Sequence, residues 1–166
     1  MENYIVSARK YRPTTFESVV GQQALTQTLR NAIRTNHLAH AYLFCGPRGV
    51  GKTTCARIFA KTINCLNPTA ENDACNQCES CAAFNEQRSF NIHELDAASN
   101  NGVDDIRALI DQVRIPPQIG KYSVYIRCGS VTYHFISFKN TWLYSSGHSQ
   151  LDFDSFACRS VCSYTV

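Results

Sequence analysis

This chain of 166 residues lacks long apolar runs, a leader-like start and the motifs of common hydrolases. Its apolar segments all fall short of the roughly 18 to 20 residues that span a membrane, so we expect no membrane anchor. Glu2, Arg9, Lys10 and Arg12 interrupt the start of the chain, which argues against a signal peptide. A nucleophile elbow, a His-Glu-x-x-His helix and internal repeats are also missing. These absences argue against secreted, membrane-spanning and repeat proteins.

Charge is scarce in the last part of the chain. Residues 1–126 carry 24 charged side chains, 11 of them acidic, whereas residues 127–166 carry only five. That last segment instead holds eight aromatic residues and eight serines. The net charge of +3 is too small to indicate nucleic-acid binding by itself. The change of composition predicts a boundary at or just after Ile126.

Helical and strand patterns alternate before that boundary, which predicts an α/β domain built on a parallel sheet. Apolar residues at helical spacing give the expected helices, at 22–36, 52–64 and 103–113. Short apolar runs give the expected strands, at 39–46, 90–97 and 121–126.

The clearest motif joins the first expected strand to the helix after it. It matches Gly-x4-Gly-Lys-Thr and comprises Gly46, Pro47, Arg48, Gly49, Val50, Gly51, Lys52 and Thr53, with Thr54 next in the helix. Glycines let backbone N–H groups wrap phosphates, and the helix N-terminus adds a favourable dipole. Lys52 is expected to pair with the β- and γ-phosphates, and Thr53 to offer its hydroxyl to Mg²⁺. In this context the motif predicts a nucleotide site rather than a chance glycine turn.

A cysteine cluster follows, with gaps of nine, two and two residues. Its members are Cys65, Cys75, Cys78 and Cys81. Four thiolates make a closed tetrahedral zinc site, which is structural because no position is left for water. Iron–sulfur ligation and four free cysteines are the alternatives. Cys45 and Cys55 lack such spacing, so we expect them to be small buried hydrophobic residues.

Other polar residues give weaker signals. The histidines, at positions 37, 40, 93, 134 and 148, have no partner at metal or catalytic spacing, so we expect structural roles for them. The basic arm of Arg9, Lys10 and Arg12 suits contact with a nucleotide or a phosphate backbone, and equally a solvated surface.

Five segments in this order resemble the gamma/tau subunits of bacterial DNA polymerase III, the AAA+ ATPases of the sliding-clamp loader. They are ARKYRPTTFESVVGQ, HAYLFCGPRGVGKTT, the cysteine cluster, NIHELDAASNNGVDDIR and IPPQIGKYSVYI. The resemblance covers about residues 1–126, and residues 127–166 do not match. It implies a P-loop AAA+ domain with a small zinc module at about 65–81, binding ATP, Mg²⁺ and Zn²⁺.

The resemblance also implies a setting. Such subunits act in the cytoplasm, in a hetero-oligomer with the delta and delta-prime subunits and the polymerase core, and load the sliding clamp onto primed DNA. Nucleotidyl transfer belongs to a partner in that complex. The adenine is expected near the N-terminal arm, which makes Arg12, Pro13 and Val20 candidate neighbours of the base or ribose.

The third expected strand departs from the family pattern at its tip. In the family this strand continues into Ile-Asp-Glu-Val-His, the Walker B segment. Here Arg127 replaces an apolar residue, Cys128 the Asp that orders Mg²⁺, and Gly129 the Glu that activates water. Without these acids we expect nucleotide binding but no hydrolysis. An unrelated P-loop enzyme is a further alternative, in which Asp96 would have to hold Mg²⁺.

The family's sheet has another strand, later in sequence, between the P-loop strand and the third strand. Residues 131–138 are β-branched and aromatic, but we expect them not to fill this slot, so that the sheet ends after three strands. A frame slip, a rearrangement or an assembly error would each produce the segment 127–166, and so would a divergent C-terminal module.

Overall fold

The computed structural model describes residues 11–47, 49–96, 107–108, 111, 113 and 115–128, with the backbone of 133–140 and 162–165. Its elements are α2 (Gln23–Arg34), β1 (Ala41–Cys45), α3 (Lys52–Ile63), α4 (Glu79–Asn85), β2 (Ile92–Asp96), β3 (Tyr122–Cys128), β4 (Tyr133–Asn140) and β5 (Cys162–Thr165). The first two expected helices and all three expected strands are confirmed to within a few residues. The expected helix at 103–113 lies largely outside the described residues.

The strands form one sheet in the order β2-β3-β4-β1-β5. β2 pairs parallel with β3, and β1 pairs parallel with β5, but β4 is antiparallel to both β3 and β1. The α/β class is therefore confirmed, whereas the expectation of a purely parallel sheet is wrong.

The slot between β1 and β3 is filled by β4, which corrects the expectation that the sheet ends after three strands. Tyr42 of β1 faces Ile136 across the ladder, and Ile126 of β3 faces the same residue from the other side. The physical reason is that an empty slot would leave two strand edges without hydrogen-bond partners. A β-branched and aromatic segment directly after β3 meets this need by turning back antiparallel, which requires only a short connection.

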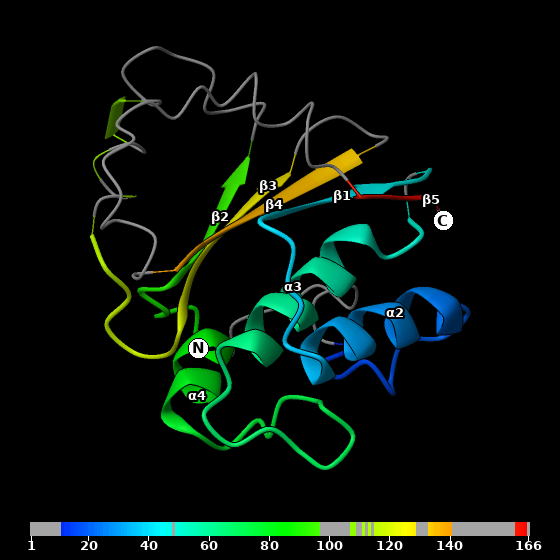
Figure 1. Cartoon of the computed structure of the whole chain (residues 1–166), viewed down its shortest axis with the longest axis horizontal. Coiled ribbons are helices and arrows are strands. Elements are labelled where there is room, and N and C mark those ends of the chain that lie inside the picture. Colours follow the sequence, from blue (N-terminus) through cyan, green and yellow to red (C-terminus); the bar gives the residue numbers. More distant parts are fainter. Residues whose placement is uncertain are drawn as a thin grey trace, which may run out of the picture.

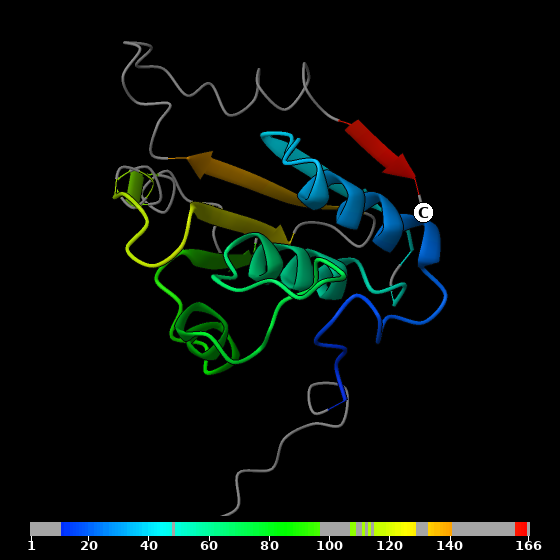
Figure 2. The ribbon, with the colours of Figure 1, turned by 60° about the horizontal axis from the view of Figure 1, so that its bottom comes forward.

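The helices α2, α3 and α4 lie on the same side of the sheet, with α3 between the other two (Figures 1 and 2). This central position explains why α3 is buried on most of its surface, including two lysines. The core between α3 and the sheet contains Phe59, Tyr42 and Val124, and the rings of Tyr42 and Phe59 meet edge to face at 4.9 Å. Among the described residues, no helix is long and apolar enough to cross a membrane.

The end of α3 is tied to the start of β3 by the buried side chain of Asn64. Its Oδ1 accepts hydrogen bonds from the backbone N–H groups of Lys121, at 3.2 Å, and Tyr122, at 2.9 Å. Gly120 has φ +104°, and a Cβ there would lie 2.9 Å from this oxygen. Only glycine therefore permits this close approach, which fixes α3 against the strand next to it.

Candidate functional site

The loop after β1 leads directly into α3, as the phosphate-binding motif requires (Figure 1). Gly49 and Gly51 have φ of +90° and +88°, values that residues with a Cβ rarely adopt. Gly51 is the N-cap of α3, and its carbonyl accepts the first helical hydrogen bond, from Cys55 N at 2.9 Å. Arg48 lies outside the described residues. The backbone thus has the turn that exposes N–H groups at the start of a helix.

Lys52 is held inside this loop. Its side chain is buried, and Nζ donates hydrogen bonds to the carbonyl oxygens of Gly46 and Pro47, both at 2.7 Å. The ammonium therefore lies against the carbonyl groups at the start of the glycine turn. Phosphate oxygens accept the same kind of hydrogen bond and carry charge, so a bound phosphate would compete for this ammonium.

The first turn of α3 has no acidic side chain to oppose an anion. Thr53 and Thr54 are half-buried in this turn, and Lys52 adds a positive charge. The helix dipole adds to this field, since the first N–H groups of a helix favour negative ligands. The site is electropositive and suits a phosphate.

The three arm residues expected near a base have different surroundings. Arg12 and Pro13 are half-buried, while Val20 is 93% exposed. Phe16, between them, is buried in the core and anchors the arm. Figures 1 and 2 both show the start of α2, which follows this arm, on the same side of the domain as the start of α3.

The tip of β3 lies at the same edge of the sheet as the P-loop. Cys45, the last residue of β1, pairs with Tyr133, and Cys128 of β3 pairs with His134, the next residue of β4. Arg127 is exposed, whereas Cys128 is half-buried and packs against the core. Gly129 lies outside the described residues. A thiol and a guanidinium therefore stand at this edge, and neither binds Mg²⁺ as a carboxylate does.

Asp96, the alternative Mg²⁺ ligand, is the last residue of β2 and pairs with Cys128. Its backbone is thus on the same sheet edge, but β3 and β4 separate it from the P-loop strand. The structure describes nothing of its side chain, so its role stays a prediction.

The four clustered cysteines come together at one point. Their Sγ atoms all lie within 4.8 Å of one another, and Cys65 Sγ is 3.5 Å from Cys75 Sγ and 3.9 Å from Cys78 Sγ. In a tetrahedral centre with zinc–sulfur bonds of about 2.3 Å, the sulfurs stand ~3.8 Å apart. The backbone N–H of Cys78 points at Cys75 Sγ at 3.3 Å, a contact that favours the thiolate. The donor set fits a tetrahedral metal ion.

The local surroundings divide the four thiols into two pairs. Burial opposes ionisation of Cys78, but hydrogen bonds from the backbone of Leu66 and Cys81 outweigh it and lower the pKa of Cys78 to about 6. Hydrogen bonds from the backbone of Gln77 and Cys78 lower the pKa of Cys75. Burial raises the pKa of Cys65 and of Cys81. Backbone hydrogen bonds therefore favour the thiolate form of Cys75 and Cys78, whereas burial favours the neutral thiol of Cys65 and Cys81.

Of the two other cysteines predicted to be buried, Cys55 is confirmed and Cys45 is not, and the structural role expected of the histidines stays a prediction. Cys55 is fully buried and burial raises its pKa to about 11, while Cys45 is only half-buried. His93 stacks on Tyr125 at 5.0 Å between ring centroids, and burial lowers its pKa. His37 Nδ1 lies 2.9 Å from the carbonyl oxygen of Thr35.

Two buried charged residues next to the cysteine cluster were not predicted from the sequence. Asp73 accepts a hydrogen bond from Phe16 N at 3.2 Å and pairs with Arg30 at 2.7 Å. Lys61 donates from Nζ to Asn76 Oδ1 at 2.5 Å. Their partners lie far away in the sequence, so no local pattern identifies them.

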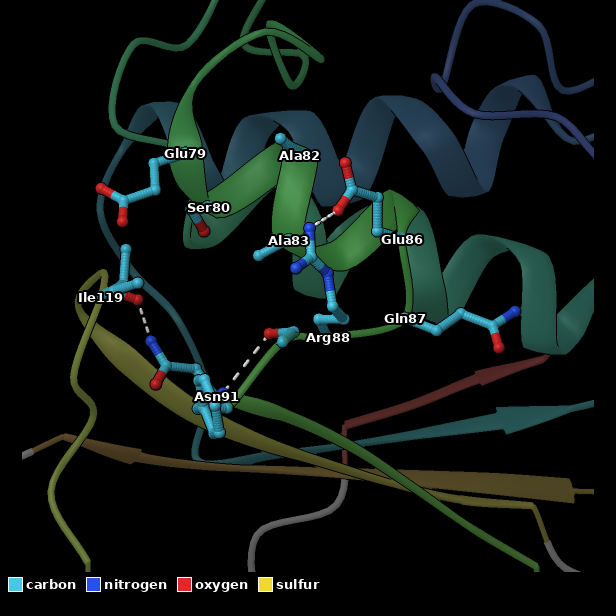
Figure 3. Close-up of a pocket in the computed structure, with 11 residues that line it drawn as sticks. Glu79, Ser80, Ala82, Ala83, Glu86, Gln87, Arg88, Asn91 and Ile119 are labelled. Atoms are coloured by element: carbon cyan, nitrogen blue, oxygen red, sulfur yellow. Dashed lines mark hydrogen bonds and ion pairs between the residues drawn. The ribbon is translucent and has the colours of Figure 1, made fainter.

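A hollow of about 630 Å³ lies beside α4, lined by that helix, residues 87–91 and Ile119 (Figure 3). Among its lining residues, Arg88 pairs with Glu86, and Asn91 Nδ2 donates to the carbonyl of Ile119. Its lining includes neither cysteine nor histidine, and α4 lies at the far end of α3 from the P-loop (Figure 1). The hollow therefore lies apart from the glycine loop between β1 and α3.

Comparison with known proteins gives consistent results. The family described as "DNA polymerase III, delta subunit" matches residues 21–129. The DNA polymerase III subunit tau of Bacillus subtilis is 46% identical over 124 residues, which cover 75% of this chain and 22% of that protein. The subunit tau/gamma of Haemophilus influenzae is 45% identical over 124 residues, 75% of this chain and 18% of that protein. The subunit gamma/tau of Mycoplasma pneumoniae is 49% identical over 118 residues, which cover 71% of this chain and 17% of that protein. The chain thus spans about a fifth of the length of these relatives.

Proposed function

Since this chain belongs to the DNA polymerase III family and is a segment of the gamma/tau type, we propose that it acts in DNA replication as the ATP-binding part of a clamp-loader subunit. In this role it works with the delta and delta-prime subunits, the polymerase core, the sliding clamp and primed DNA. We place it in the cytoplasm with that complex.

The observation that carries this proposal is the position of Lys52. Its buried ammonium lies over a glycine turn at the start of α3, 2.7 Å from two loop carbonyls. The triphosphate would replace these carbonyls as acceptor, and the first N–H groups of α3 would bind the same phosphates. Thr53, next in the helix, would offer its hydroxyl to Mg²⁺.

The second candidate function is a zinc-stabilised nucleotide-binding module that does not hydrolyse ATP. The half-buried thiol of Cys128 favours this second function, because it lies at the same edge of the sheet as the end of β1, the strand that leads into the P-loop. Hydrolysis requires a carboxylate that orders Mg²⁺ and another that orients water, and Arg127 and Cys128 provide neither. Zinc at the four cysteines would then contribute to folding rather than to chemistry.

Titration of the chain with a fluorescent ATP analogue tests the nucleotide site. Lys52→Ala removes a charge-assisted contact worth about 1.5 to 3 kcal/mol, so affinity should fall by about 10- to 100-fold. Lys121→Ala, which removes an exposed lysine from the start of β3, should bind as the parent chain does. Equal affinity of the Lys52 variant and the parent would refute the site.

Phosphate release measured on the same preparations tests whether the chain hydrolyses the ATP that it binds. Intact bound ATP is the expected result, because Arg127 and Cys128 stand in place of the carboxylates, whereas steady release of phosphate that Lys52→Ala abolishes would rule out the non-hydrolysing module.

A further inference from the structure

A buried lysine lies next to the cysteine cluster. Lys61 is on the last turn of α3 and only 2% exposed. Its Nζ donates to Asn76 Oδ1 at 2.5 Å, and Asn76 lies between Cys75 and Cys78 in the chain. That acceptor is a neutral amide, which does not neutralise the charge of an ammonium.

A buried ammonium is stabilised by a negative partner, since desolvation of an unpaired charge is unfavourable. The groups whose negative charge would favour the Lys61 ammonium are Cys81, Asp73 and Cys65, the two sulfurs only as thiolates, while Arg57 repels it. Asp73 already pairs with Arg30 at 2.7 Å. This leaves the sulfurs of the cluster as the groups that can balance Lys61.

We propose that Lys61 is the charge-compensating partner of a tetrathiolate zinc centre formed by the four clustered cysteines. Zn²⁺ with four thiolates carries a net charge of −2, which is as costly to bury as any other uncompensated ion. Lys61 on α3 and the centre therefore stabilise each other, and zinc binding reinforces the end of the helix that begins at the P-loop. This inference rests on the zinc site of the proposed function.

Zinc affinity of neutral variants at position 61 tests the proposal. Lys61→Met keeps an unbranched apolar chain that is one atom shorter, and Lys61→Gln keeps an N–H donor, but both remove the charge. We expect each to weaken Zn²⁺ binding about 10- to 100-fold, measured by competition with a chromophoric chelator. Lys121→Met is the matched control at an exposed lysine and should bind zinc as the parent does.

Thermal unfolding with and without a chelator distinguishes charge compensation from simple packing. Without metal the buried ammonium lacks the net charge of −2 of the four-thiolate zinc centre, so Lys61→Met should leave the midpoint of unfolding unchanged or raise it. With zinc the same variant should lower the midpoint. Equal lowering in both states would overturn the proposal, and so would zinc binding by Lys61→Gln at parental affinity.

Absorption of the Co²⁺-loaded parent chain separates this inference from the zinc site itself. Charge-transfer bands typical of four thiolates, together with unchanged affinity in both Lys61 variants, would refute the role of Lys61 alone. Absence of those bands in the parent would refute the metal site first.

Discussion

At the residue scale, the four clustered cysteines share one proposed role, as metal ligands, but differ in their own acidity. Cys78 lies at the start of α4, where backbone N–H groups surround its sulfur, whereas Cys81 is fully buried one turn later. Thiolates are the species that bind metal and react with electrophiles. The difference in acidity therefore becomes a difference in reactivity when metal is removed.

Alkylation of the metal-free chain with iodoacetamide should modify Cys78 first. Because its pKa is lowered to about 6, its alkylation rate should rise with pH to a plateau with a midpoint near pH 6. Cys55, whose pKa burial raises to about 11, should stay unmodified until the chain unfolds. Peptide mass spectrometry at several pH values gives both rates.

Two results would contradict the predicted order of alkylation. A rate at Cys78 that rises only around pH 8.5 would mean that its thiol is not perturbed. Modification of Cys55 in the folded chain would mean that it is not buried. Zinc is expected to protect the four clustered cysteines from alkylation. Cys55 serves as the internal reference for folding, because it should stay unmodified with or without zinc.

The sequence predicted that the four cysteines would come together, but it did not predict that Lys61 and Asp73 would be buried beside them. The gaps between Cys75, Cys78 and Cys81 are local, so spacing alone identifies a turn that brings sulfurs together. In the sequence Lys61 and Asp73 are ordinary charged residues. They become buried only because α3 packs against the loop of residues 65–78, the cysteine loop. Supporting residues are defined by tertiary contacts, which local spacing does not encode.

At the element scale, the cysteine loop holds the N-terminal arm and α2 in place through Asp73. One carboxylate oxygen accepts from Phe16 N at 3.2 Å, and the other from Arg30 at 2.7 Å. Asp73 N in turn donates to Thr69 Oγ1 at 3.1 Å. A single buried carboxylate thus connects three segments, including the arm proposed to lie near the nucleotide base.

Asp73→Asn should loosen this connection. The variant removes the charge that pairs with the partly buried Arg30, and we expect it to lower the free energy of unfolding by about 1 to 3 kcal/mol. Limited proteolysis should cleave residues 11–20 faster than in the parent chain. Urea unfolding followed by circular dichroism measures the change in stability.

Glu71→Gln is the matched control, because Glu71 also faces Arg30 but at 3.9 Å and with 67% of its side chain exposed. An exposed pair at that distance contributes about 0 to 1 kcal/mol. If Glu71→Gln destabilised the chain as much as Asp73→Asn, the connection would be a general charge effect, and Asp73 would not anchor the arm.

At the scale of the whole molecule, the sheet brings the P-loop and the tip of β3 to one edge even though β4 runs antiparallel between them. The sequence predicted the helices and strands because their apolar periodicities are local. It did not predict the direction of β4, because β-branched and aromatic residues favour a strand without specifying its partner. Cys128 consequently occupies the edge position at which the family's pattern has a carboxylate.

The fate of ATP bound to the parent chain tests the central claim most directly. The chain is incubated with γ-labelled ATP and Mg²⁺, separated from free nucleotide, and the bound label is analysed over time. We predict that the label is recovered as intact ATP, with Lys52→Ala retaining far less than the parent, because the phosphates are held while neither Arg127 nor Cys128 orders Mg²⁺ or water. Release of labelled phosphate by the parent chain, but not by Lys52→Ala, would contradict the account.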